Sequence, residues 1–115
     1  MKGHFLLDPG ASHSVIDETK KEKFLLHTEE SKDRRAGLGG QAETAISFEN
    51  NLLVGDEFYV SSQTIYVMSL AHVNAALQRY GVDEIEGIIS ADILTRHAAV
   101  LEYVDSNLYL KKEVM

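Results

Sequence analysis

The chain contains no cysteine, which excludes disulfide bridges, thiolate nucleophiles and cysteine-based zinc or iron–sulfur sites. It has one proline, Pro9, so no proline-rich linker divides it. Lysine and arginine total 11 against 18 aspartates and glutamates, and the basic residues form no cluster larger than an adjacent pair. The resulting net charge of -7 argues against a surface for nucleic acids or acidic membranes, because both require clustered positive charge.

Long apolar runs are also missing. No segment approaches the ~20 apolar residues that a membrane-spanning helix needs. Asp8 interrupts the apolar N-terminal run too early for a signal peptide, so the sequence favours a cytoplasmic location. A chain of 115 residues with 44% hydrophobic residues can bury one core, and disorder is not expected. We therefore expect a single domain spanning residues 1–115.

Short apolar segments, several of them rich in β-branched and aromatic residues, recur along the chain and favour strands. Strands are predicted at residues 4–8, 14–17, 45–48, 51–54, 58–60, 64–70, 85–89, 99–103 and 107–110. Helices are predicted at residues 18–26, 71–80 and 91–97, and a polar loop at residues 29–35. Many short strands with a few small helices indicate a mostly-β domain, a small closed or partly closed barrel.

Local signals mark the ends of two of these helices. Asp17 suits the N-cap of the helix at 18–26, because its carboxylate can accept a hydrogen bond from the first turn. Gly81 is a good C-terminal stop for the helix at 71–80. The buried face of the first helix is expected to consist of three apolar residues, Phe24, Leu25 and Leu26.

The stretch at residues 5–17 holds a carboxylate on a rigid frame. An apolar run delivers Asp8 into a turn made by Pro9 and Gly10, and a patch of small residues then leads into a second apolar strand. The first two small residues are Ala11 and Ser12. The stretch resembles the active-site loop of retropepsin-like aspartic proteases, in which Asp is followed by Thr or Ser, Gly, Ala and then Ser.

Two later segments carry the same resemblance. The glycine-rich run at 36–40 is similar to the flap of non-viral retropepsin-like proteins, with four expected substrate-facing residues, Gly37, Leu38, Gly39 and Gly40. The run at 85–94 is similar to the family's second signature, here carried by Ile88, Ile89, Ser90 and Asp92. A short helix and a closing hairpin follow, as in the family. The chain thus resembles a non-viral, bacterial-type retropepsin-like aspartyl protease with an atypical Asp-Pro-Gly loop.

The resemblance implies an acid-protease fold and an aspartic endopeptidase that acts as a homodimer on a peptide or protein substrate. Each chain would contribute Asp8 to a dyad that activates a water and protonates the leaving amine. The loop around it would comprise Pro9, Gly10, Ala11 and Ser12. By the same resemblance, neither a metal nor an organic cofactor is needed.

Two residues depart from the family pattern. The family's Thr or Ser after the aspartate hydrogen-bonds across the two-fold axis, whereas Pro9 has neither a hydroxyl nor a backbone N–H. Ser90 stands where the family usually has Gly, so it places a side chain against the active-site loop. The family's usual lead-in strand is also missing before Asp8. These departures favour an alternative, a catalytically inactive, protease-derived domain with a peptide-binding or structural role.

Other polar residues have simpler interpretations. Asp92 could be a second carboxylate within one chain, but an aspartate near a helix N-terminus is the simpler hypothesis because it favours the helix dipole. Ser12, His13 and Asp17 invite a hydrolase triad, yet neighbours in a strand point to opposite faces, so Ser12 and His13 could not meet.

Histidines and clustered acids carry no metal signal. The five histidines show no metal-ligand spacing and are expected near the surface: His4, His13, His27, His72 and His97. Asp83, Glu84 and Glu86 form an acidic patch, for which solvated surface is a simpler interpretation than a cation site.

Overall fold

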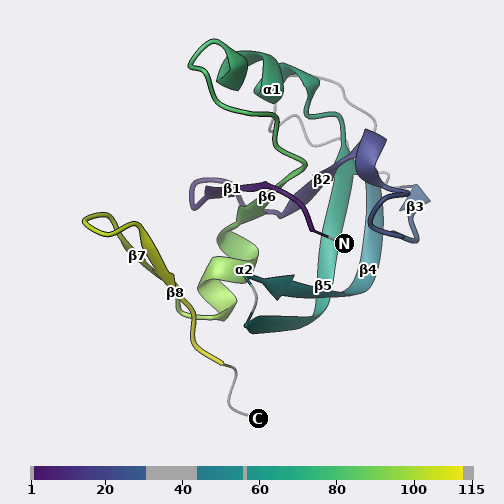
Figure 1. Cartoon of the computed structure of the whole chain (residues 1–115). Coiled ribbons are helices and arrows are strands. Elements are labelled where there is room, and N and C mark those ends of the chain that lie inside the picture. Colours follow the sequence, from purple (N-terminus) through teal and green to yellow (C-terminus); the bar gives the residue numbers. More distant parts are fainter. Residues whose placement is uncertain (1, 31–43, 56, 113–115) are drawn as a thin grey trace.

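The computed structural model describes residues 2–30, 44–55 and 57–112 (Figure 1). Two α-helices occur in these residues, α1 (Ala71–Gln78) and α2 (Ala91–Arg96), together with a 3₁₀ turn, η1 (Glu18–Lys20). The strands are β1 (Phe5–Asp8), β2 (Val15–Asp17), β3 (Glu29–Glu30), β4 (Ala45–Val54), β5 (Phe58–Met68), β6 (Gly87–Ser90), β7 (Val100–Glu102) and β8 (Asn107–Tyr109). No helix among the described residues is both long and apolar enough to cross a membrane.

Six of the strands form one sheet in the order β1-β6-β2-β5-β4-β3. Strand β6 therefore lies between β1 and β2, parallel to β1 and antiparallel to β2. Strands β7 and β8 form a separate antiparallel hairpin, which Figure 1 shows projecting from the body of the molecule beside α2. The sheet brings the ends of β1 and β6 side by side, and both segments that resemble protease signatures meet there.

The core is divided between two clusters that use alternate residues of β1 and β6. Leu6 and Ile88 belong to the cluster under α1, whereas Phe5 and Ile89 belong to the cluster that contains α2. Successive side chains of a strand point to opposite faces, so the two clusters cover the two sides of the sheet. Gly87 has no room for a side chain, because a Cβ there would lie 2.6 Å from the Val15 carbonyl oxygen.

Most of the predicted elements are confirmed, with boundaries shifted by a few residues. The helix predicted at 71–80 is α1, and Gly81 follows it with a positive φ of 73°. The helix predicted at 91–97 is α2, and the final hairpin is β7–β8. The strands predicted at 45–48 and 51–54 are one irregular strand, β4, whose register shifts on both sides of Asn50. The strands predicted at 58–60 and 64–70 likewise merge into β5.

The helix predicted at 18–26 is wrong. Asp17 does cap the first turn, through the Thr19 N–H, but that turn is the 3₁₀ segment η1 and the chain then continues in turns. Leu25 has a positive φ of 55° and is 82% exposed, so it does not belong to a buried face. The predicted loop at 29–35 begins with the short strand β3, which pairs with β4. The described residues form an open sheet, and the closed barrel stays a prediction.

Candidate active site

Asp8, the predicted catalytic residue, is the last residue of β1, and the chain turns directly after it. The Ala11 N–H donates to the Asp8 carbonyl oxygen at 3.2 Å, and the Gly10 N–H donates to Asp8 Oδ1 at 3.1 Å. The Asp8 side chain is half-buried, whereas Pro9 is exposed. Gly10 is not in the left-handed region, and a Cβ there would make only an ordinary contact with Asp8 Oδ1 at 3.4 Å. The amide of Gly10, more than its missing side chain, therefore orients the carboxylate.

The loop after Asp8 is fixed to the second signature by backbone hydrogen bonds. Asp8 lies opposite Ser90 in the parallel register of β1 and β6. One turn later, the Ala91 N–H donates to the Ala11 carbonyl oxygen at 2.9 Å. The Ser90 N–H donates to the Ser14 hydroxyl at 3.0 Å. Both sides of the loop are thus tied to the junction between β6 and α2.

Asp92 completes this anchor. Its carboxylate accepts hydrogen bonds from the Ser14 hydroxyl at 2.6 Å and the Ser14 N–H at 2.9 Å. Gln63 Nε2 donates to the same carboxylate at 3.2 Å, and Gln63 Oε1 accepts a bond from Arg96 Nη1 at 3.3 Å. The predicted place of Asp92 near a helix N-terminus is confirmed, since it lies in the first turn of α2 and accepts from the Ile93 N–H. Its contacts assign it to holding the loop, not to a second carboxylate of a dyad.

Sequence reasoning missed the partners of Asp92. Ser14 is 78 residues from Asp92, and Gln63 is 29 residues from it, so no local pattern links them. A buried polar residue next to an apolar strand is the one available signal: Ser14 precedes the apolar pair of β2, and Gln63 interrupts β5. That signal indicates a buried hydrogen bond, but it does not identify the partner.

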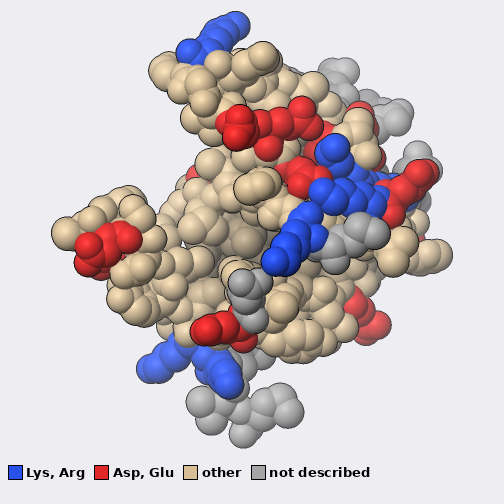
Figure 2. All heavy atoms as spheres, viewed as in Figure 1, with Lys and Arg blue, Asp and Glu red and all other residues tan. Residues whose placement is uncertain are grey.

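A hollow of about 380 Å³ opens beside the active-site loop. It is lined by Pro9 together with α2 and the segment that follows it: Ala91, Leu94, Thr95, Ala98, Ala99 and Leu101. The neighbouring hairpin exposes large apolar and aromatic side chains: Val100, Tyr103, Val104 and Tyr109. Figure 2 shows that charged side chains lie mainly around the edge of this view and uncharged side chains fill its middle. The surface next to Asp8 is therefore suited to apolar contact.

The other predicted residues are placed less directly. The flap residues Gly37, Leu38, Gly39 and Gly40 lie outside the described residues. The Ser12, His13 and Asp17 triad is not formed, because Asp17 is committed elsewhere. Its Oδ1 accepts from the Leu70 N–H at 2.7 Å, and its Oδ2 accepts from Thr19. The His13 ring instead lies against Tyr66, with ring centroids 4.8 Å apart.

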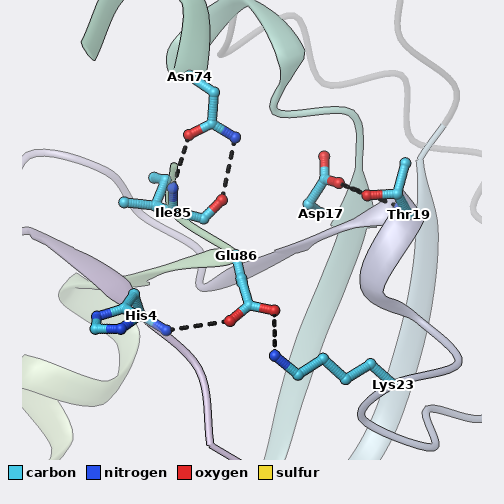
Figure 3. A network of polar contacts seen from close by, with 7 residues as sticks. All are labelled: His4, Asp17, Thr19, Lys23, Asn74, Ile85 and Glu86. Atoms are coloured by element: carbon cyan, nitrogen blue, oxygen red, sulfur yellow. Dashed lines mark hydrogen bonds and ion pairs between the residues drawn. The ribbon is translucent and has the colours of Figure 1, made fainter. Parts of the chain in front are cut away.

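Glu86 corrects the interpretation of the acidic patch as solvated surface. It is 9% exposed, forms a 2.6 Å ion pair with Lys23, and accepts a hydrogen bond from the His4 N–H (Figure 3). The Lys23 ammonium, more than any other neighbour, holds the pKa of the Glu86 carboxyl below its ordinary value. Asp83 and Glu84 are exposed, as predicted. The described part of the chain contains no group of three acidic or histidine side chains arranged to hold a metal ion.

A model of the aspartyl protease family matches residues 2–93, which include both β1 and β6. The chain belongs to this family. The aspartyl protease fold is also found among solved structures: the retroviral protease-like domain of Ddi1 from Leishmania major superposes with a TM-score of 0.58. That match has 18% sequence identity and covers 90% of this chain and 74% of the Ddi1 chain, so it supports the mostly-β retropepsin-like fold. No curated protein matches the aspartyl protease chain.

Proposed function

We propose that this aspartyl protease is an active aspartic endopeptidase in which two copies of the chain pair and each contributes Asp8. The observation that carries the proposal is the placement of that carboxylate. It stands half-buried at the end of a core strand, with Oδ1 held by the Gly10 N–H. Among the described residues, none donates a hydrogen bond to its Oδ2, which leaves that oxygen for a water or a second carboxylate.

The chemistry follows from bringing two such carboxylates together. Two aspartates at short range do not both ionise, so the pair shares one proton and titrates as a unit. The ionised member removes a proton from a water, which attacks the carbonyl carbon of the scissile peptide. The protonated member donates its proton, and the C–N bond breaks as the amine nitrogen is protonated. The substrate class is an extended peptide or protein segment, over which the glycine-rich run at 36–40 is proposed to close.

The surface around Pro9 supports pairing of two chains. The Pro9 ring lines the apolar hollow, and the hairpin beside it exposes Tyr103 and Val104 at 85% and 90%. Burying such side chains removes apolar area from water, which favours association. Because Pro9 has no hydroxyl to bond across the two-fold axis, apolar packing would hold the two loops together. An isologous pair would use the hollow and the hairpin of both chains.

A second candidate function is an inactive, protease-derived domain that binds peptides or has a structural role. One observation favours it: Pro9 removes the hydroxyl that locks the paired loops in the family, and no described side chain bonds to Asp8 in its place. In that case the anchored loop and the hollow would serve recognition alone. Cleavage assays separate the two functions.

The test combines assembly with catalysis. We expect sedimentation over a wide concentration range to show a dimer, and a peptide-library screen from acidic to neutral pH to show cleavage. Asp8→Asn is the matched control, because it preserves the shape of the side chain and should abolish cleavage without unfolding the domain. A chain that stays monomeric at every concentration, or cleavage that survives Asp8→Asn, would contradict the shared dyad.

A further inference from the structure

Ser90 carries a hydroxyl that the fold leaves unused. It is the N-cap residue of α2, a position at which a serine side chain ordinarily accepts a hydrogen bond from the first turn. Here it makes no such bond, although the residue is 0% exposed. Its Oγ has no hydrogen-bond partner among the described residues. A buried hydroxyl without a partner destabilises a fold, so its presence at this position requires a reason.

Asp92 explains why the hydroxyl is unused. The Ile93 N–H, which a capping serine at position 90 could have bound, donates instead to Asp92 Oδ1 at 2.8 Å. The Ser90 backbone is also engaged, because its N–H donates to the Ser14 hydroxyl. The backbone of Ser90 therefore belongs to the loop anchor, whereas its side chain is released from capping the helix.

The released hydroxyl lies next to Asp8 in the sheet. The two residues are register partners on parallel strands, so their side chains leave the sheet on the same face. The preceding pair on that face, Leu6 and Ile88, packs into one core cluster, which confirms the alternation. Asp8 has an oxygen, Oδ2, that receives no hydrogen bond from a described residue, and Ser90 has a donor without an acceptor.

We infer that Ser90 is a positioning residue for the dyad: its hydroxyl donates to Asp8 Oδ2 in the assembled pair of chains. This inference rests on the proposed function and deepens it. The two departures from the family pattern then belong together. Pro9 removes a hydroxyl from the residue after the aspartate, and Ser90 supplies one from the neighbouring strand. The bond fixes the second oxygen of the carboxylate, as Gly10 fixes the first, and so aims Asp8 at its counterpart.

Ser90→Ala is the decisive variant, with Ser90→Thr as the conservative one. A hydrogen bond to a charged group corresponds to a loss of roughly ten- to a hundredfold in kcat/KM when it is removed. We expect that loss in Ser90→Ala, with a displaced pH profile of kcat/KM, and recovery of both in Ser90→Thr. Thermal stability should hold or rise in Ser90→Ala, because the variant removes a buried hydroxyl that lacks a partner in the single chain.

Ser47 provides a matched control. It is also a buried serine, but its hydroxyl has a partner in Asn50, on β4 and away from the loop. Ser47→Ala should lower thermal stability and leave kcat/KM unchanged, which is the reverse of Ser90→Ala. Wild-type kcat/KM and an unchanged pH profile in Ser90→Ala would overturn the inference and leave Ser90 as a tolerated buried hydroxyl.

A measurement without turnover separates failure of this inference from failure of the proposed function. Carbon-13 NMR of the Asp8 carboxyl, assigned with Asp8→Asn, reports its hydrogen bonding whether or not the chain cleaves peptides. A resonance that is altered in Ser90→Ala and restored in Ser90→Thr supports the contact even in a protein with no activity. Identical resonances in all three proteins overturn it, even if the wild type is an active protease.

Discussion

Replacement of Asp92 by asparagine tests the anchor of the active-site loop. The Asp92 carboxylate accepts four hydrogen bonds, two on each oxygen. Oδ2 accepts from the Ser14 N–H and from Gln63, and Oδ1 accepts from the Ser14 hydroxyl and the Ile93 N–H. Each oxygen therefore faces a backbone N–H that cannot reverse its role. In either orientation of an asparagine amide, its NH₂ group meets one of these donors.

The magnitude follows from that count. One buried donor left without an acceptor costs about 1–3 kcal/mol, and the remaining bonds lose the strength that the negative charge gave them. Because the four bonds share one carboxylate, their contributions do not simply add. We expect Asp92→Asn to lower the free energy of unfolding by about 2–4 kcal/mol. For a domain of this size that corresponds to a melting temperature lower by roughly 10 °C or more.

Urea denaturation monitored by circular dichroism measures this change. The midpoint should fall while the m-value stays constant, because the surface exposed on unfolding is the same. Asp83→Asn is the control, since Asp83 is an exposed acid on the loop after α1 and should change stability by less than about 0.5 kcal/mol. If Asp92→Asn unfolded at the same urea concentration as Asp83→Asn, the loop would not depend on the Asp92 hydrogen bonds.

Three further changes test other parts of the structure. Glu86→Gln should lower stability by about 1 kcal/mol at neutral pH, because its partner Lys23 is more than a third exposed and solvent screens the pair. The folded-state pKa of Glu86 is depressed, so this contribution is present above the ordinary carboxyl value and is lost as pH falls through the folded value; urea midpoints at pH 7 and pH 3 measure it. Gly87→Ala should destabilise by about 1–3 kcal/mol, because a Cβ would meet the Val15 carbonyl oxygen at 2.6 Å; thermal unfolding measures it. Val104→Asp should weaken pairing of two chains and leave the fold intact, as sedimentation and circular dichroism would show.

Each of these expectations has a result that contradicts it. A Glu86→Gln variant whose deficit persists undiminished at pH 3 would show that the ion pair is not the cause. A fully stable Gly87→Ala variant would mean that the backbone of β6 shifts readily away from β2. A Val104→Asp variant with unchanged self-association would place the contact between chains elsewhere.

Local sequence signals predicted the elements whose cause is local. The apolar runs before Asp8 and before Ser90 predicted β1 and β6, since buried parallel strands are almost continuously apolar. The helix α1 was predicted because good helix formers end at Gly81, which takes the left-handed conformation that stops a helix. The position of Asp8 at the end of β1 followed from the Pro-Gly turn.

Tertiary contacts decided what the sequence did not predict. Residues 18–26 have the composition of a helix, but Asp17 accepts a hydrogen bond from the distant Leu70 N–H, and Leu25 adopts a positive φ. The partners of Asp92 come from β5 and from the start of β2, and the ion pair of Glu86 joins residues 63 positions apart. Such pairings depend on strand order, and a local sequence window does not contain strand order.

The insertion of β6 between β1 and β2 has a consequence for synthesis of the chain. Until residues 87–90 have left the ribosome, β1 has no partner strand in the sheet and Asp8 has no neighbour to hold its loop. Contacts between segments so far apart in sequence form slowly, because a long loop must close first. A nascent chain that stops before β6 therefore exposes the aspartate on an unpaired segment. Such a fragment carries the catalytic motif without the geometry that makes it a protease, which protects the cell from premature cleavage during translation.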